Sequence, residues 1–298
     1  MNIHLENVNL NSTSGPNSFG QKLVKYLPEG NNLSSIDNAD VRLCFIESPY
    51  SAHKTPLVQR LDGIYFNDKQ DYNAQNSNIK RTYKQAAAII FQSEFSKNLV
   101  TRWFGDHENY TIVHNGADIE KINSISAIEN KALDRYDNVW CCASHWRPHK
   151  RLSENIRYFL EHSSERDCLV VAGETSKKIN HERIYYTGNL QHETLIALYK
   201  RSSTFIHLGR FDNCPNVVVD ARASGCHIVC ASLGGTIEIA GADATVLQEE
   251  PWDYQPLDLY NPPNLDFSKK QKNVWNIDIN MKKVAEKYVT ILKSVLEK

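Results

Sequence analysis

Two aspartates with seven residues between them, Asp212 and Asp220, surround the junction of an apolar run and a predicted helix. The apolar run ends near Leu208, a short loop follows, and the helix is predicted to begin near Pro215. The free amides at a helix start attract phosphate. An acid in the preceding loop can reach the hydroxyls of a ligand, and an acid in the second turn can reach a ribose diol. Taken alone, the pair also fits an ordinary loop acid and a solvated helix acid.

Glycines follow this junction at fixed distances, with Gly225 closing the helix and Gly234-Gly235 standing where the next strand is predicted to end. The whole segment resembles the donor domain of the retaining family 4 glycosyltransferases of the GT-B fold. So many spaced matches are more specific than a lone glycine pattern. The positions that match without a gap are Pro215, Asn216, Val217, Val218, Ala221, Ala223, Gly225, Val229, Gly234, Gly235 and Glu238.

Four further segments resemble the same family. The segment with Arg147 and Lys150 resembles its basic R-x-x-P-x-K-G motif, and the segment around Gly188 resembles the stretch near the nucleoside base. Residues 112–118 resemble the end of the first domain, and Gly15 takes the place of a glycine-rich first loop. The resemblance covers about residues 12 to 240 and is strongest from 205 to 238.

The resemblance implies that a sugar, of hexosyl type, moves from a nucleotide diphosphate sugar to a hydroxyl with its anomeric configuration retained. Arg147, Lys150 and the amides of Asn216 and Val217 would neutralise the departing diphosphate without a metal. Asp212 would bind the hydroxyls of the donor sugar, and Asp220 those of the ribose. The remaining donor-site positions would be Gly15, Gly188, Asn213, Pro215, Gly234 and Gly235, the glycine pair letting backbone approach the donor.

The chain also departs from the family. Both acids are aspartates where glutamates are usual, so each carboxylate is one methylene shorter. Asn213-Cys214 replaces a glycine-phenylalanine pair.

On the acceptor side, Asp62 follows an apolar run at Leu57–Leu61. We expect it to contact or deprotonate the acceptor. An Asp-Gly pair that only forms a turn fits this position equally well.

Apolar runs alternate with helical patterns along the chain, which predicts parallel sheets covered on both faces. The predicted fold is α/β: two Rossmann-like doubly wound domains facing across a cleft, as in GT-B proteins. We expect an acceptor-binding domain at 1–132, a donor-binding domain at 133–270 and a last helix at 271–298 that packs back on the first domain. The first helix is predicted from Phe19 to Leu27, with Gly15 in the loop before it.

Composition narrows the class of protein. The 298 residues carry 34 basic and 35 acidic side chains, a near-neutral balance that argues against nucleic acid as a partner. The seven cysteines include no C-x2-C pair, which favours reduced thiols in the cytoplasm and argues against a metal site. The sequence predicts no signal peptide and no transmembrane segment, with peripheral membrane contact left open.

The expected donor is a UDP- or GDP-sugar, the expected acceptor a glycan or glycoconjugate, and no tightly bound cofactor is predicted. Two other functions stay open at this point. One is a nucleotide-sugar 2-epimerase of the same fold, and the other is a non-catalytic nucleotide-sugar-binding protein. A dehydrogenase is disfavoured because no G-x-G-x-x-G follows the first predicted strand.

Overall fold

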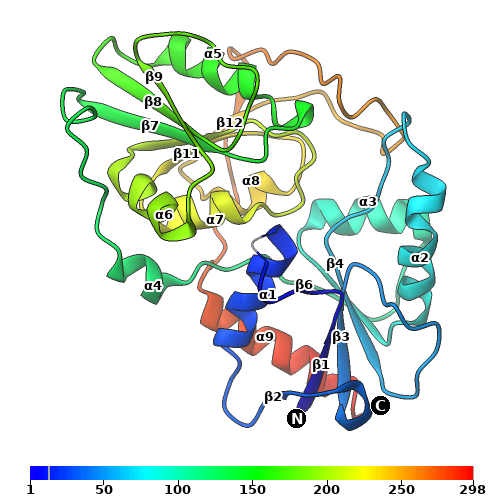
Figure 1. Ribbon diagram of the computed structural model, residues 1–298. Helices are drawn as coiled ribbons and strands as arrows, with labels where there is room; N and C mark the ends of the chain where they lie inside the picture. The colour runs from blue at the N-terminus through cyan, green and yellow to red at the C-terminus, as the bar shows by residue number, and fades with distance from the viewer. Residues whose placement is uncertain (13, 298) are drawn as a thin grey trace. The chain divides into compact units, whose positions relative to one another are not determined.

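The chain folds into two compact units, each built around its own sheet (Figure 1). A computed structural model describes residues 1–12 and 14–297. Unit 1 comprises the described residues of Met1–Ala117, Asp253–Asp258 and Asp278–Lys298. Unit 2 comprises Asp118–Trp252 and Leu259–Ile277.

The sheet of unit 1 has six parallel strands in the order β2-β1-β3-β4-β5-β6. Strands β3, β4 and β5 are buried along their whole length, so their apolar runs are explained by helices on both faces. The strands are β1 Asn2–Glu6, β2 Asn32–Leu33, β3 Val41–Phe45, β4 Leu57–Leu61, β5 Ala88–Phe91 and β6 Tyr110–Ile112.

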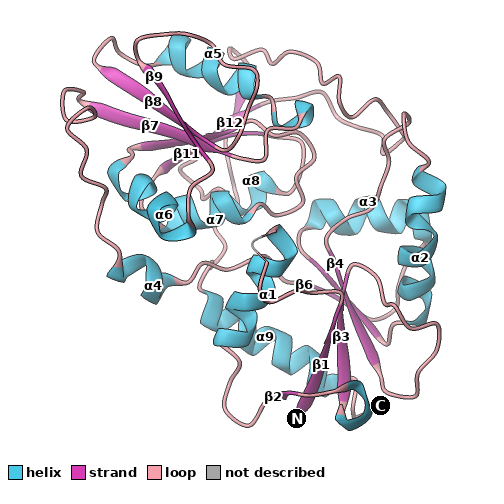
Figure 2. Ribbon diagram, viewed as in Figure 1, coloured by secondary structure: helices cyan, strands magenta, loops and turns pink. Residues whose placement is uncertain are grey.

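Helices α1 and α9 pack together against this sheet, and α2 and α3 contact β4 and β5 (Figure 2). The buried residues of α9 recur three and four positions apart, and they join Phe19 and Leu23 of α1 in one core. The predicted return of the last helix to the first sheet is therefore confirmed. The helices are α1 Gly15–Lys25, η1 Ile36–Asn38, α2 Tyr72–Gln85, α3 Glu94–Phe104 and α9 Met281–Ser294.

The start of α1 differs from the prediction. The helix begins at Gly15, with Ser14 in an extended conformation as its N-cap and Pro16 in its first turn. Proline suits this turn because its fixed φ is already helical and its missing N–H has no partner to lose. Gly15 is therefore the first helical residue, where the sequence predicted a loop, and it is exposed.

The sheet of unit 2 has seven strands in the order β13-β12-β11-β10-β7-β8-β9. All pairs are parallel except β12 with β13. The strands are β7 Asn138–Ala143, β8 Asp167–Ala172, β9 Ile184–Gly188, β10 Thr204–His207, β11 His227–Ala231, β12 Thr245–Leu247 and β13 Lys270–Gln271.

Helix α5 covers one face of this sheet through Ile156 and Phe159, and α6 and α7 contact β7, β10 and β11 from the other (Figure 2). The predicted α/β class with two doubly wound parallel sheets is thus confirmed. The helices are α4 Ile119–Ser124, η2 Pro148–Lys150, α5 Leu152–His162, α6 His192–Arg201, α7 Asn216–Ala223 and α8 Thr236–Ile239.

The seven cysteines are buried free thiols. No described helix combines the length and the hydropathy that crossing a bilayer would require.

Candidate active site

The strand order of unit 2 reverses between β10 and β7, which are hydrogen-bonded neighbours. Chain segments leave the carboxyl ends of these two strands as loops, one carrying Lys150 and the other carrying Asp212. In open parallel sheets, ligands bind outside the carboxyl ends of the strands at such a reversal. The fold therefore brings two predicted site residues, 62 positions apart in sequence, to the expected place.

The Asp212 carboxylate is held by two donors. Lys150 Nζ donates to Oδ1, and His207 Nε2 lies 2.6 Å from Oδ2. Burial alone would raise the pKa of Asp212, but the charge of Lys150 and the bond with His207 outweigh it and hold that pKa well below its usual range. Since an ionised carboxylate only accepts hydrogen bonds, His207 Nε2 carries the hydrogen.

The glycine pair holds the backbone of the Asp212 loop. The Gly235 N–H donates to the Asp212 carbonyl at 2.7 Å. Gly234 has φ +120°, and a Cβ there would lie 2.9 Å from the same carbonyl oxygen. The structure thus places both predicted glycines directly against the loop that carries Asp212.

Two residues of this cluster were missed by sequence reasoning, His207 and Gly209. A Cβ on Gly209 would lie 2.7 Å from Asp212 Oδ2 and 3.0 Å from His207 Nε2, so only glycine leaves room for their contact. The one available signal for His207 was a titratable residue at the end of an otherwise apolar buried strand.

The basic loop after β7 presents its cations differently. Arg147 is exposed and precedes the short helix η2, whereas Lys150 is only 18% exposed at its side chain. Burial, then the charge of Lys150, lowers the pKa of His149 to about 4. Arg151, with φ 53°, is buried and pairs with Glu249 at 2.7 Å, which anchors the loop.

Helix α7 starts directly after the Asp212 loop. Pro215 is its N-cap, its carbonyl accepts from the amides of Val218 and Val219, and no acidic residue occupies the first turn. Asn213, Asn216 and Val217 are partly buried beside this helix start. Amides and the positive end of the helix dipole therefore stand next to Asp212 and Lys150.

Asp220, in the second turn of α7, is buried and its Oδ2 lies 3.2 Å from His192 Nε2 at the start of α6. Gly188 ends β9 with φ +66°, and a Cβ there would lie 2.8 Å from Glu174 Oε1. The structure therefore pairs Asp220 with His192 and places Gly188 beside Glu174.

The remaining predicted residues, Asp62 and Gly15, belong to unit 1. Asp62 follows β4 and accepts from the guanidinium of Arg60, which also donates to Asn115 Oδ1 at 3.0 Å. Arg60 is only 1% exposed and lies over the ring of Phe19 at 4.2 Å. The Asp62 carboxylate is thereby fixed by a buried, stacked cation.

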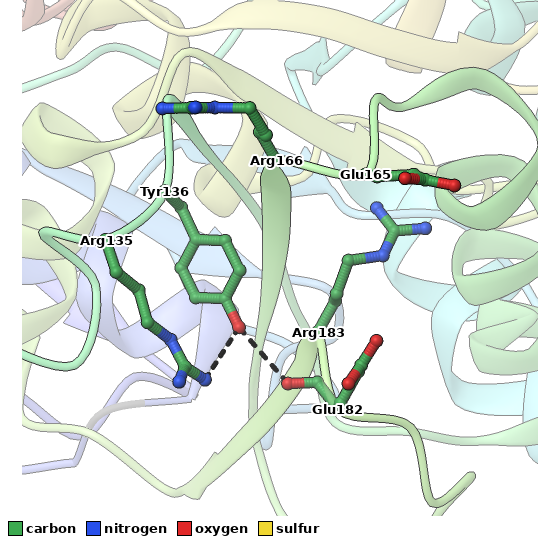
Figure 3. A pocket seen from close by; sticks show the side chains of 6 residues that line it. All are labelled: Arg135, Tyr136, Glu165, Arg166, Glu182 and Arg183. Carbon is green, nitrogen blue, oxygen red and sulfur yellow. Dashed lines mark hydrogen bonds between the residues drawn. The ribbon is translucent and has the colours of Figure 1, made fainter.

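A cavity of about 330 Å³, whose lining side chains are drawn in Figure 3, lies at the opposite end of the unit 2 sheet, where β7, β8 and β9 begin. Its lining residues precede β7, β8 and β9, and its arginines already have partners, such as Arg166 with Asp137 at 2.6 Å. It is therefore distinct from the Asp212 cluster. The lining residues are Arg135, Tyr136, Glu165, Arg166, Glu182 and Arg183. Nowhere in the described part of the chain do three His, Cys, Asp or Glu residues gather as a metal site would require.

Residues 137–254 match the family model of glycosyl transferases group 1. An uncharacterized glycosyltransferase of Methanocaldococcus jannaschii is 24% identical over 253 residues, covering 78% of this chain. The chain spans 64% of the length of that curated relative.

Solved structures of glycosyltransferases share the fold of the whole chain. HepE of Anabaena, solved with UDP-glucose, aligns at TM-score 0.64 and 12% identity over 100% of this chain and 98% of its own. A glycosyltransferase of Rickettsia africae aligns at TM-score 0.64 and 14% identity, over 100% of this chain and 99% of its own. WaaG, a glycosyltransferase involved in lipopolysaccharide biosynthesis, aligns at TM-score 0.61 and 10% identity, over 100% of this chain and 93% of its own. The predicted resemblance is confirmed: residues 137–254 match the family model of glycosyl transferases group 1, and the chain has the GT-B fold.

Proposed function

We propose that this chain is a retaining glycosyltransferase of hexosyl type that uses a nucleotide diphosphate sugar and needs no bound metal. The observation that carries the proposal is the Lys150–Asp212–His207 cluster beside the start of α7, at the strand-order reversal of unit 2. The cluster combines an ionised carboxylate for hydroxyls with a cation and helix amides for phosphate.

Asp212 can bind sugar hydroxyls even though two donors already hold it. An ionised carboxylate offers about four acceptor positions, and Lys150 and His207 use two of them. The others are available to hydroxyls of the donor sugar. Asp220 is proposed to bind the ribose, and Gly188 and Asn213 to adjoin the donor.

Leaving-group stabilisation falls to Arg147, Lys150 and the amides of Asn216 and Val217. The departing nucleotide diphosphate gains negative charge as its bond to the sugar breaks, and fixed cations and amides stabilise that charge. HepE, of the same fold, was solved with UDP-glucose and with UDP and glucose. This supports a UDP-sugar as the first donor to test, with a GDP-sugar as the alternative.

The acceptor, a glycan or glycoconjugate, is proposed to bind the acceptor domain, residues 1–132, with Asp62 contacting its hydroxyl. The buried Arg60 keeps the Asp62 carboxylate in one orientation. The donor would bind residues 133–270. The buried free thiols support a reducing compartment such as the cytoplasm.

The proposal is tested first by binding and then by turnover. A nucleotide that binds only the folded chain raises its melting temperature by mass action. We expect such a shift with UDP or GDP and their sugars, and sugar transfer to glycan acceptors in the presence of EDTA, with the anomeric configuration followed by NMR.

Asp212→Asn is expected to lower kcat/KM about a hundredfold, because it removes the ionised acceptor while keeping its size. Asp243→Asn, at an exposed aspartate of the same unit, is the matched control and should leave turnover unchanged. Absence of any nucleotide shift, or formation of an epimer from the donor alone, would contradict the proposal.

A further inference from the structure

His207 has a geometry that its place in an apolar strand does not require. It is the last residue of β10, only 4% exposed, and its ring lies parallel to that of Phe205 at 6.2 Å and 11°. The ring nitrogens of a buried histidine in such a strand could form their hydrogen bonds with backbone groups. Instead its Nε2 points at Asp212 Oδ2 from 2.6 Å.

The two partners of Asp212 differ in how firmly they can hold it. Lys150 carries its ammonium on a flexible four-carbon stem, so it supplies charge without fixing a direction. The imidazole of His207 is rigid and confined by its strand and by Phe205. His207 is therefore the partner that sets the orientation of the carboxylate.

The surrounding backbone is shaped for this contact. Gly209 leaves free the space in which a Cβ would press on both Asp212 Oδ2 and His207 Nε2. The Gly235 amide fixes the Asp212 carbonyl at 2.7 Å. With main chain and one oxygen both fixed, the short aspartate side chain has little remaining freedom.

We propose that His207 is a positioning residue for the donor sugar, acting through Asp212. It keeps the carboxylate turned so that its unused acceptor positions serve the sugar hydroxyls. The inference rests on the proposed function and deepens it, because it assigns His207 to recognition of the sugar and leaves the nucleotide to other residues.

The test measures the affinities of UDP and UDP-glucose by titration calorimetry for the full chain and its variants. In His207→Leu, which keeps volume but removes the donor, we expect the affinity for UDP-glucose to fall about tenfold. The affinity for UDP should not change. His207→Gln, whose amide can donate near the position of Nε2, should restore most of the difference.

Two further variants control for damage to the fold. Gly209→Ala keeps the histidine at position 207 but places a Cβ against both Asp212 Oδ2 and His207 Nε2, so it should reproduce the selective loss. His227→Leu removes another strand histidine of the same sheet, which contacts Thr245 Oγ1 at 3.0 Å, and it should leave both affinities unchanged.

The outcomes distinguish a failure of the positioning role of His207 from a failure of the proposed function. Equal losses of UDP and UDP-glucose affinity in His207→Leu would overturn the positioning role, as would unchanged affinities for both. If the unaltered chain binds no UDP, UDP-glucose, GDP or GDP-sugar, the proposed function fails and the inference falls with it.

Discussion

At the scale of single residues, the proposed donor site depends on how one short carboxylate, that of Asp212, is held in place. Asp212 lies between the ammonium of Lys150 and the imidazole of His207, and its low pKa follows from both. The spacing of Asp212 and Asp220 was readable in the sequence because it follows a family pattern. The role of His207 was not, since a histidine closing an apolar strand looks the same whether or not a loop returns to it.

His149, next to Lys150, gives a prediction for pH. Its folded pKa of about 4 lies below its ordinary 6.5, so between these values the unfolded chain binds more protons than the folded one. Stability contributed by neutral His149 is therefore full above pH 6.5 and is lost as the pH falls. We expect this group alone to lower the free energy of unfolding by about 2 kcal/mol between pH 7 and pH 5.

His149→Phe keeps a ring to stack on Tyr260 but does not titrate, so its unfolding free energy should fall less over this range. Urea titration followed by tryptophan fluorescence measures this, because Trp140, Trp146, Trp252 and Trp275 of the five tryptophans lie in unit 2. His149→Gln should show the same reduced pH dependence. A variant whose pH dependence equals that of the unaltered chain would refute the buried neutral imidazole.

At the scale of elements, the turn after β11 supports the loop after β10. Gly234 and Gly225 both have positive φ, +120° and +97°, but only at Gly234 would a Cβ meet neighbouring backbone. Substituting each glycine in turn therefore distinguishes the effect of backbone strain, which both positions share, from displacement of the Asp212 loop, which only Gly234 would cause.

We expect Gly225→Ala and Gly234→Ala each to lose about 1–2 kcal/mol of stability or more, because an L-residue is strained at these angles. Only Gly234→Ala should also lower kcat/KM, by about a hundredfold, since displacing a positioning group by about 1 Å has that effect. Thermal unfolding and steady-state kinetics with the donor measure both. Equal kinetic losses in the two variants would show that the Asp212 loop does not depend on Gly234.

The elements that the sequence predicted well are those with long apolar patterns. Helix α9 has an apolar face of clear helical period, and the sequence predicted it within residues 271–298. Strands β2 and β13 have two residues each and no apolar pattern to read. The first turns of helix α2, from Tyr72 on, are also polar, so only its N-cap, Asp71, signals where it starts.

At the scale of the whole molecule, three separate segments of the chain make up unit 1. Residues 253–258 return to it, where the Leu257 carbonyl accepts from the Asp68 amide at 3.0 Å and the Tyr254 carbonyl accepts from Trp103 at 2.9 Å. Hydrogen bonds to backbone carbonyls leave no periodic pattern in a sequence, so the sequence could not predict them. The return of helix α9 to unit 1, by contrast, is predicted by the apolar face of that helix.

Each unit has its own hydrophobic core, which predicts that damage to one is felt mainly there. Leu292 of α9 is 1% exposed within the core of unit 1, although it lies more than 170 residues beyond the end of that unit's first segment. Leu292→Ala should cost about 2–5 kcal/mol, through lost burial and the cavity left behind. Lys293→Ala, at the exposed neighbour, is the control and should cost little.

Hydrogen exchange followed by mass spectrometry locates the damage. In Leu292→Ala, peptides from β3 and β4 should lose protection, whereas those from β7 and β8 should exchange as in the unaltered chain. The donor nucleotide should then still slow exchange in unit 2, because the donor-site residues from Arg147 to Gly235 lie in that unit and only Gly15 belongs to unit 1. Equal loss of protection in both sheets would mean that the chain unfolds as one cooperative body, with α9 stabilising the donor site as well as the unit that contains it.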